Sequence, residues 1–165
     1  MQSARALVLW LVLAAWLTAC GSGAGTSANP SPSPSPQPDT VTVKYVALVH
    51  AYWTTYVIAR GNGATVCLDR VDPPQCRVRA AAILVVHQKF LSDLDTTPPP
   101  PKFAADDQAF RRQLPKAIAD VKKMISAADG GDKQAVQDAT SAYVSDMIPD
   151  VTGALDHVDP SLTHD

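Results

Sequence analysis

Residues 102–128, KFAADDQAFRRQLPKAIADVKKMISAA, decide the fold class, because apolar side chains recur in them every three or four positions. This spacing matches the 3.6 residues of one α-helical turn and predicts a helix with one buried face. The predicted face comprises Phe103, Asp107, Phe110, Leu114, Ile118, Val121, Ile125 and Ala128. Prolines 98–101 suit a first helical turn, Gly130 and Gly131 end the helix, and Pro115 predicts a kink inside it.

Three other segments have the same helical period, at residues 40–60, 76–94 and 133–158, the last with a predicted kink at Pro149. In the first of them, the stripe comprises Val46, Val49, His50, Trp53, Val57 and Arg60. No stretch alternates apolar and polar residues as a strand does. Four amphipathic segments joined by short connections predict an all-α domain over residues 40–165, an up-down-up-down four-helix bundle.

The composition narrows the range of functions. The chain has 165 residues, is 46% hydrophobic and carries a net charge of −2, and all sixteen acidic residues are Asp. Metal and protease motifs that need Glu at a fixed position are therefore excluded. The weakly negative charge and the lack of a basic run argue against a nucleic-acid partner. The sequence has no nucleophile elbow, no Ser-x-x-Lys and no phosphate loop, so we expect a protein that is not an enzyme.

The N-terminus has the pattern of an export signal. Arg5 precedes an apolar run of twelve residues, ALVLWLVLAAWL at 6–17, which is shorter than the ~20 residues of a membrane-spanning helix. The run leads into Leu17-Thr18-Ala19-Cys20. Two of the three tryptophans lie in this segment, which leaves Trp53 as the one that can serve the fold.

The Leu-Thr-Ala-Cys sequence resembles the lipobox of bacterial lipoproteins, and the composition is similar to that of small actinobacterial lipoproteins. The resemblance implies a signal peptide at 1–19, a diacylglyceryl thioether on Cys20 and an extracytoplasmic domain anchored to the cell membrane. Two acyl chains suffice for stable anchoring. An ordinary secretory signal and an uncleaved anchor are the alternatives.

Residues 20–39 predict a tether. Gly21 to Asn29 is small and polar, and Pro30 to Pro38 alternates proline with serine or glutamine. The first composition is typical of a flexible linker and the second of a polyproline II spacer. A Pro-rich ligand for another protein, or a glycosylated segment, is the alternative interpretation.

Cys67 lies in the predicted connection 61–75, and Cys76 follows directly after it at the start of the predicted helix 76–94. Lipidation of Cys20 leaves these two as a pair, and outside the cytosol a pair is expected to be oxidised. We predict one structural disulfide in the connection between the first two helices. A redox pair and two metal thiolates are the alternatives.

His50 and His87 are the candidate metal ligands. If residues 40–60 and 76–94 form antiparallel neighbours, the two imidazoles lie at the same level and could hold haem or a transition metal. The alternative is a pair of core-edge histidines, each bonded to a backbone carbonyl or a tyrosine. The chain has no Cys-x-x-Cys-His for covalent haem, and the primary expectation is no cofactor.

Aromatic side chains concentrate in residues 40–60, where the candidate ligand-binding residues are Tyr45, Tyr52, Trp53 and Tyr56. They could line a pocket for a small apolar molecule, with the phenolic hydroxyls as polar contacts. Core packing is the alternative. Arg60, Arg70, Arg77 and Arg79 predict one locally positive end of the domain, either solvated or facing an anionic envelope component.

These observations together predict a non-enzymatic scaffold or binding module of the cell envelope. Its partners would be the membrane, through the lipid anchor, and an envelope protein or a small apolar ligand. A haem- or metal-binding bundle using His50 and His87 is the alternative function.

Overall fold

A computed structural model of the chain describes residues 39–147 and 151–162. The predicted signal peptide, Cys20, the tether before Asp39 and the predicted kink at Pro149 lie outside the described residues. The helices are α1 (Thr40–Arg60), the π-helical turn η1 (Thr65–Asp69), α2 (Pro73–Thr96), the 3-10 turn η2 (Pro101–Phe103), α3 (Ala104–Asp129), α4 (Lys133–Met147) and α5 (Gly153–Val158). The described part of the chain contains no strand, which confirms the all-α prediction.

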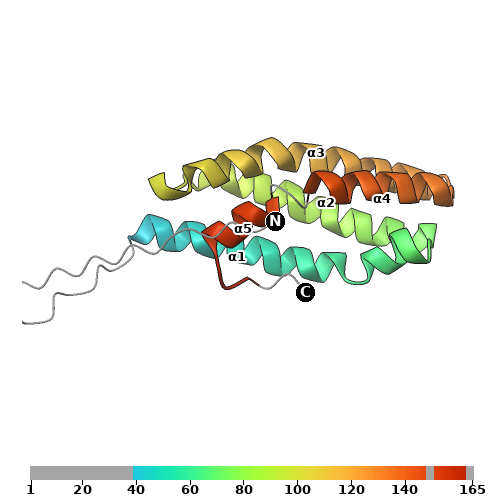
Figure 1. The fold of residues 1–165 in the computed structure, drawn as a ribbon, viewed down its shortest axis with the longest axis horizontal. Helices are drawn as coiled ribbons and strands as arrows, with labels where there is room; N and C mark the ends of the chain where they lie inside the picture. Colours follow the sequence, from blue (N-terminus) through green and yellow to red (C-terminus); the bar gives the residue numbers. More distant parts are fainter. Residues whose placement is uncertain (1–38, 148–150, 163–165) are drawn as a thin grey trace, which may run out of the picture. The chain divides into compact units, whose positions relative to one another are not determined.

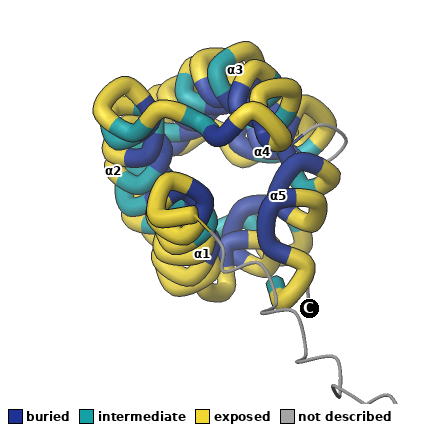
Figure 2. The backbone as a smooth tube through the Cα atoms, turned by 90° about the vertical axis from the view of Figure 1, so that its left-hand side faces the viewer, coloured by how far each residue is buried: buried dark blue, intermediate teal, exposed yellow. Residues whose placement is uncertain are grey.

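The described residues form one compact unit in which the long helices lie side by side (Figure 1). α2 packs against α1 and α3, and α3 packs against α4. The short α5 contacts α3 and α1, whereas α1 and α4 do not pack closely on one another. The buried residues face the space that these helices surround (Figure 2). None of the helices in the described ranges is both long and apolar enough to cross a bilayer.

α3 carries the predicted buried face, but the face is turned slightly around the helix. Phe110, Leu114 and Val121 are fully buried, as predicted. Ala117 and Met124 are buried in place of their neighbours Ile118 and Ile125, which are only partly covered. Pro115 lies inside α3, which runs continuously through it.

The predicted stripe of α1 is partly wrong. Tyr52 and Tyr56 are buried, whereas Val57 and His50, which the stripe included, are exposed. A tyrosine ring offers more area to bury than a valine, and its hydroxyl can be satisfied in a core when a polar partner faces it. The helix therefore turns its aromatic side inward.

The connection between α1 and α2 is shorter and more ordered than predicted. α2 begins at Pro73, three residues before the predicted Cys76, because Asp72 caps it by accepting a hydrogen bond from the Gln75 amide at 3.2 Å. The preceding residues are not an open loop, since Thr65–Asp69 forms the turn η1.

The fourth predicted helix, 133–158, corresponds to α4 and α5 in the described residues. α4 is described up to Met147 and α5 begins at Gly153, and residues 148–150 between them are not described. α5 lies against α1 and α3 rather than along α2. This placement positions α5 beside the space between α1 and α4 (Figure 2).

Candidate binding pocket between α1 and α4

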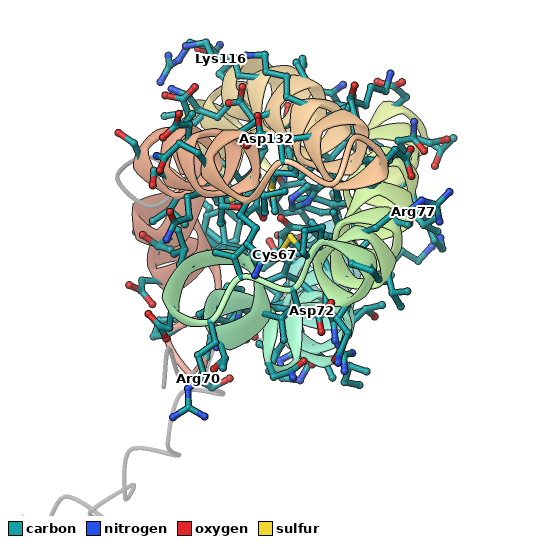
Figure 3. The ribbon with its side chains drawn as sticks, turned by 90° about the vertical axis from the view of Figure 1, so that its right-hand side faces the viewer. Cys67, Arg70, Asp72, Arg77, Lys116 and Asp132 are labelled. Atoms are coloured by element: carbon teal, nitrogen blue, oxygen red, sulfur yellow. A yellow bond between two sulfur atoms is a disulfide. The ribbon has the colours of Figure 1, made fainter. Side chains whose placement is uncertain are left out.

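The disulfide lies at the end of the domain shown in Figure 3. The Cys67 and Cys76 sulfurs are at disulfide distance, with Cα atoms 5.1 Å apart, and both residues are buried. Cys67 belongs to η1 and Cys76 to the first turn of α2, so the bond ties the turn to the helix. Gln137 of α4 holds the same turn by donating from its side-chain amide to the Leu68 carbonyl at 2.8 Å.

A pocket of about 520 Å³ lies beside the disulfide, where α1 and α4 separate. Its walls come from α1, η1, α2, α3, α4 and the start of α5. The lining residues are Trp53, Tyr56, Arg60, Gly63, Ala64, Cys67, Leu68, Arg79, Ile83, Met124, Thr140, Tyr143, Val144, Met147, Thr152 and Asp156. Most of this wall is apolar, and the volume falls within the range of about 300–1,000 Å³ that is typical of small-molecule sites.

A chain of hydrogen bonds borders the pocket and crosses the core. The Tyr52 hydroxyl is 3.1 Å from Nδ1 of His87, and Nε2 of His87 is 2.9 Å from the Tyr143 hydroxyl. The Tyr143 hydroxyl in turn donates to the Tyr56 hydroxyl at 3.2 Å and lies 3.6 Å from the Met147 sulfur. Side chains of α1, α2 and α4 are thus joined through one imidazole.

Burial keeps the imidazole and the three tyrosine hydroxyls of this hydrogen-bond chain uncharged at neutral pH. It lowers the pKa of His87 to about 4, because no charged partner compensates the imidazolium there among the described residues. It raises the pKa of Tyr52 and of Tyr143 well above the ordinary value. It also raises the pKa of Tyr56, although the hydrogen bond from Tyr143 and the nearby Arg60 guanidinium oppose the shift. The three hydroxyls therefore remain donors.

Two partly buried arginines stand among the pocket-lining residues. Arg60 is the last residue of α1, and Arg79 lies in the second turn of α2. The Arg79 guanidinium donates from Nε to the Asn62 side-chain oxygen at 3.0 Å. It also covers Gly61, where an added Cβ would lie 3.0 Å from Nη1. The glycine has φ of +45°, a backbone conformation that L residues with side chains rarely adopt, so both space and conformation favour glycine here.

The structure divides the four predicted ligand-binding aromatics into two groups. Trp53 and Tyr56 line the pocket, with ring centroids 5.4 Å apart. Tyr52 is not among the lining residues, and its ring stacks on that of Phe90 with centroids 4.0 Å apart. Tyr45 is fully buried elsewhere, where its hydroxyl donates to Asp107 at 3.1 Å.

Tyr45 belongs to a separate polar cluster that joins α1 to α3. The Asp107 carboxylate that it contacts also accepts from Nε of Arg111 at 2.7 Å. The same guanidinium donates to Asp95 and to the Leu94 carbonyl at the end of α2, both at 2.6 Å. This cluster satisfies a buried carboxylate and a helix end, which is a structural role.

The structure does not bring His50 and His87 together as a ligand pair. His87 is fully buried and both of its ring nitrogens face tyrosine hydroxyls, as the core-histidine alternative predicts. His50 lies two residues from Tyr52 and therefore on the other side of α1, where 57% of its side chain is exposed. Its Nδ1 is 2.8 Å from Asp159 instead. Within the described ranges, no group of three or more metal-binding side chains gathers at one place.

Two histidine–aspartate contacts hold the α5 region, which borders the pocket. His50 on α1 meets Asp159, the residue after α5, and His157 on α5 meets Asp106 on α3 at 2.9 Å. Burial raises the pKa of Asp159, but hydrogen bonds from Ser161 and His50 outweigh it, so the net shift is downward. These contacts fix the segment that follows the described part of α4.

Several pocket residues were not among the predicted site residues, chiefly Tyr143 and Met147, whereas Arg79 was predicted as part of the locally positive end. Tyr143 and Met147 lie on the apolar stripe of 133–158, where a tyrosine is as readily explained by core packing. A polar-tipped aromatic on the stripe, opposite a helix rich in tyrosine and histidine, is the signal that could have identified it. Comparison with protein-family models, with curated proteins and with solved structures found no match to this chain.

Proposed function

We propose that this chain is a membrane-anchored bacterial lipoprotein whose extracytoplasmic domain is a non-enzymatic binding module for a small apolar molecule. The observation that carries the binding function is the pocket between α1 and α4, walled by Trp53, Tyr56 and Tyr143. The lipobox at Cys20 carries the proposed location.

The physical argument rests on the pocket wall. Ile83, Met124, Val144 and Met147 provide an apolar surface, and removal of a ligand's apolar surface from water contributes roughly 25 cal/mol per Å². Methionine side chains adapt their shape to a partner, so the wall can follow a ligand contour. The Thr140 hydroxyl donates to the Val136 carbonyl at 2.7 Å and the Tyr143 hydroxyl donates to Tyr56, so we take the Tyr56 hydroxyl as the polar contact that orients a ligand.

The pocket also agrees with an up-down-up-down arrangement of four helices, which we propose for this domain. In such a bundle the first and last helices are neighbours, and ligand sites form between facing helices. Here the last helix would consist of α4 and α5 in succession, with α5 covering one end of the gap beside α1.

The test uses the processed protein in lipid nanodiscs and the uncharged dye N-phenylnaphthylamine, whose emission rises in an apolar pocket. Val144→Phe places a ring in the pocket and is expected to weaken dye binding about tenfold or more. Val85→Phe is the matched control, because Val85 is an exposed residue on α2 outside the pocket. Equal binding to both variants and the unchanged protein would overturn the proposed pocket function.

The anchor is tested separately by mass spectrometry of the mature chain. We expect an N-terminus at Cys20 that carries a diacylglyceryl group. An unmodified Cys20 sulfur, or a mature N-terminus elsewhere, would reject the lipoprotein assignment without affecting the pocket.

A further inference from the structure

We propose that the pocket selects an amphiphile that carries one anionic group, with Arg60 and Arg79 as its recognition residues and Tyr56 as a hydrogen-bond donor to it. This inference rests on the proposed binding function and adds the chemical class of the ligand.

The charges of the pocket wall favour an anion. Arg60 and Arg79 contribute two positive charges and Asp156 contributes one negative charge, so the wall is cationic by one unit at neutral pH. Arg60 and Arg79 are both residues of intermediate exposure that line the pocket together with apolar side chains such as Ile83. An anionic group with an apolar body would match both parts of the wall.

Arg79 is held in place for such a contact. Its Nε bond to Asn62 uses one of five N–H donors and fixes the plane of the guanidinium. Gly61 leaves room for that plane, since its missing Cβ would lie 3.0 Å from Nη1. The terminal amino groups then form a planar fork, a geometry that matches a carboxylate, sulfonate or phosphate.

The hydrogen-bond chain leaves a donor at Tyr56. Three tyrosine hydroxyls and one neutral imidazole hold four polar hydrogens, whereas three bonds link Tyr52, His87, Tyr143 and Tyr56. When Tyr143 donates to Tyr56, the imidazole donates to Tyr143 and Tyr52 donates to the imidazole. The hydrogen of Tyr56 is then left over, and Tyr56 lines the pocket. The alternative in which Tyr143 donates to the Met147 sulfur is weaker, because a thioether is a poor acceptor.

The test compares two dyes with the same rings, anilinonaphthalene sulfonate and uncharged N-phenylnaphthylamine, on the processed protein in nanodiscs, with empty nanodiscs subtracted. We expect the sulfonate to bind more tightly, and Arg79→Gln to reduce its affinity about tenfold while changing that of the neutral dye by less than about twofold. Arg77→Gln is the matched control, two residues away on α2, where the side chain pairs with Asp129 outside the pocket.

Tyr56→Phe is expected to reduce the affinity for the sulfonate about threefold or more, because the hydroxyl that donates to the anion is lost while the ring remains. The substitution also removes the acceptor of the Tyr143 hydroxyl. Equal affinities for the two dyes, or equal effects of Arg79→Gln and Arg77→Gln, would overturn the anion preference. The proposed pocket would survive that outcome if Val144→Phe still blocked the neutral dye.

Competition then separates the sources of the anionic group. Displacement of the sulfonate by octanoate identifies a free carboxylic acid, and displacement by a short-chain phosphatidylglycerol identifies a phospholipid headgroup; either result supports the proposal. Displacement by octanol alone contradicts it.

Discussion

The buried His87 imidazole is the residue whose replacement tests the core most directly. It is fully buried, and both ring nitrogens are within hydrogen-bond distance of tyrosine hydroxyls, Tyr52 at 3.1 Å and Tyr143 at 2.9 Å. His87→Leu preserves approximate volume and removes both bonds. We expect the variant to fold and to lose stability.

The magnitude follows from the partners left behind. Tyr52 would be buried without the hydrogen bond that the structure shows for its hydroxyl, at a cost of about 1–3 kcal/mol. Tyr143 would lose one hydrogen bond, which adds about 0.5–1 kcal/mol to the cost. It would retain its contact with the Tyr56 hydroxyl at 3.2 Å. Part of this loss is offset because leucine is more apolar than histidine. The expected decrease in the free energy of unfolding is about 2 kcal/mol.

The assay is urea unfolding of the processed protein, followed by far-ultraviolet circular dichroism and by the emission of Trp53, which lies next to Tyr56. Tyr52→Phe alone should destabilise the protein by about 1 kcal/mol. Added to His87→Leu, however, it should restore about 1 kcal/mol, because it removes the unsatisfied hydroxyl. If the two substitutions add as independent losses, the coupling through the imidazole is refuted.

The same residue predicts a pH dependence. The folded-state pKa of His87 is about 4, below the ordinary value of 6.5, so the unfolded chain binds a proton there more readily. The neutral His87 therefore makes its full contribution to the free energy of unfolding above about pH 6.5. This contribution is lost as the pH falls, by about 2–3 kcal/mol near pH 4.5. His87→Leu should lack this component, and an unchanged pH profile in the variant would contradict a neutral buried imidazole.

Two further predictions concern the end of the domain that holds the disulfide. Replacing Cys67 and Cys76 together by alanine should reduce stability by about 3 kcal/mol in the chain-entropy model, checked by thermal unfolding with and without reductant, and an equal melting temperature would contradict it. Gly61→Ala should cost about 1–3 kcal/mol, because φ is +45° and the added Cβ meets the Arg79 guanidinium. Gly131→Ala is its control, with φ of +70° but open space, so an equal loss in both would exclude a steric part.

The helices that the sequence predicts best are those whose pattern is unambiguous. α3 ends within one residue of the predicted position, because Gly130 and Gly131 cannot favourably continue it. The Cys67–Cys76 pairing is also confirmed at disulfide distance, as the local separation and the count of cysteines suggested. Both predictions depend on residues that are close in sequence.

The inward face of α1 could not be predicted in the same way. Hydropathy favours Val57 over Tyr56, yet the structure buries Tyr56 and exposes Val57. The tyrosine is accommodated because Tyr143, 87 residues away, donates a hydrogen bond to its hydroxyl oxygen. Likewise, the two ring nitrogens of His87 face the hydroxyls of Tyr52 and Tyr143, which lie on two other helices. These hydrogen-bond partners come from other helices through tertiary packing, and the residue pattern of a single helix carries no information about them.

The pocket also arises from tertiary packing between helices, and the way its walls are built explains why the disulfide lies beside it. The turn that carries Cys67 and Leu68 forms one wall, and a short irregular turn would otherwise be a mobile part of the site. The bond to Cys76 and the Gln137 contact hold that wall against α2 and α4 before any ligand arrives. A ligand that binds in a pocket whose wall is already ordered does not pay the entropic cost of ordering that wall. More of the free energy from apolar burial and charge pairing then contributes to affinity. Opening the disulfide should therefore weaken dye binding even under conditions where the helices remain folded.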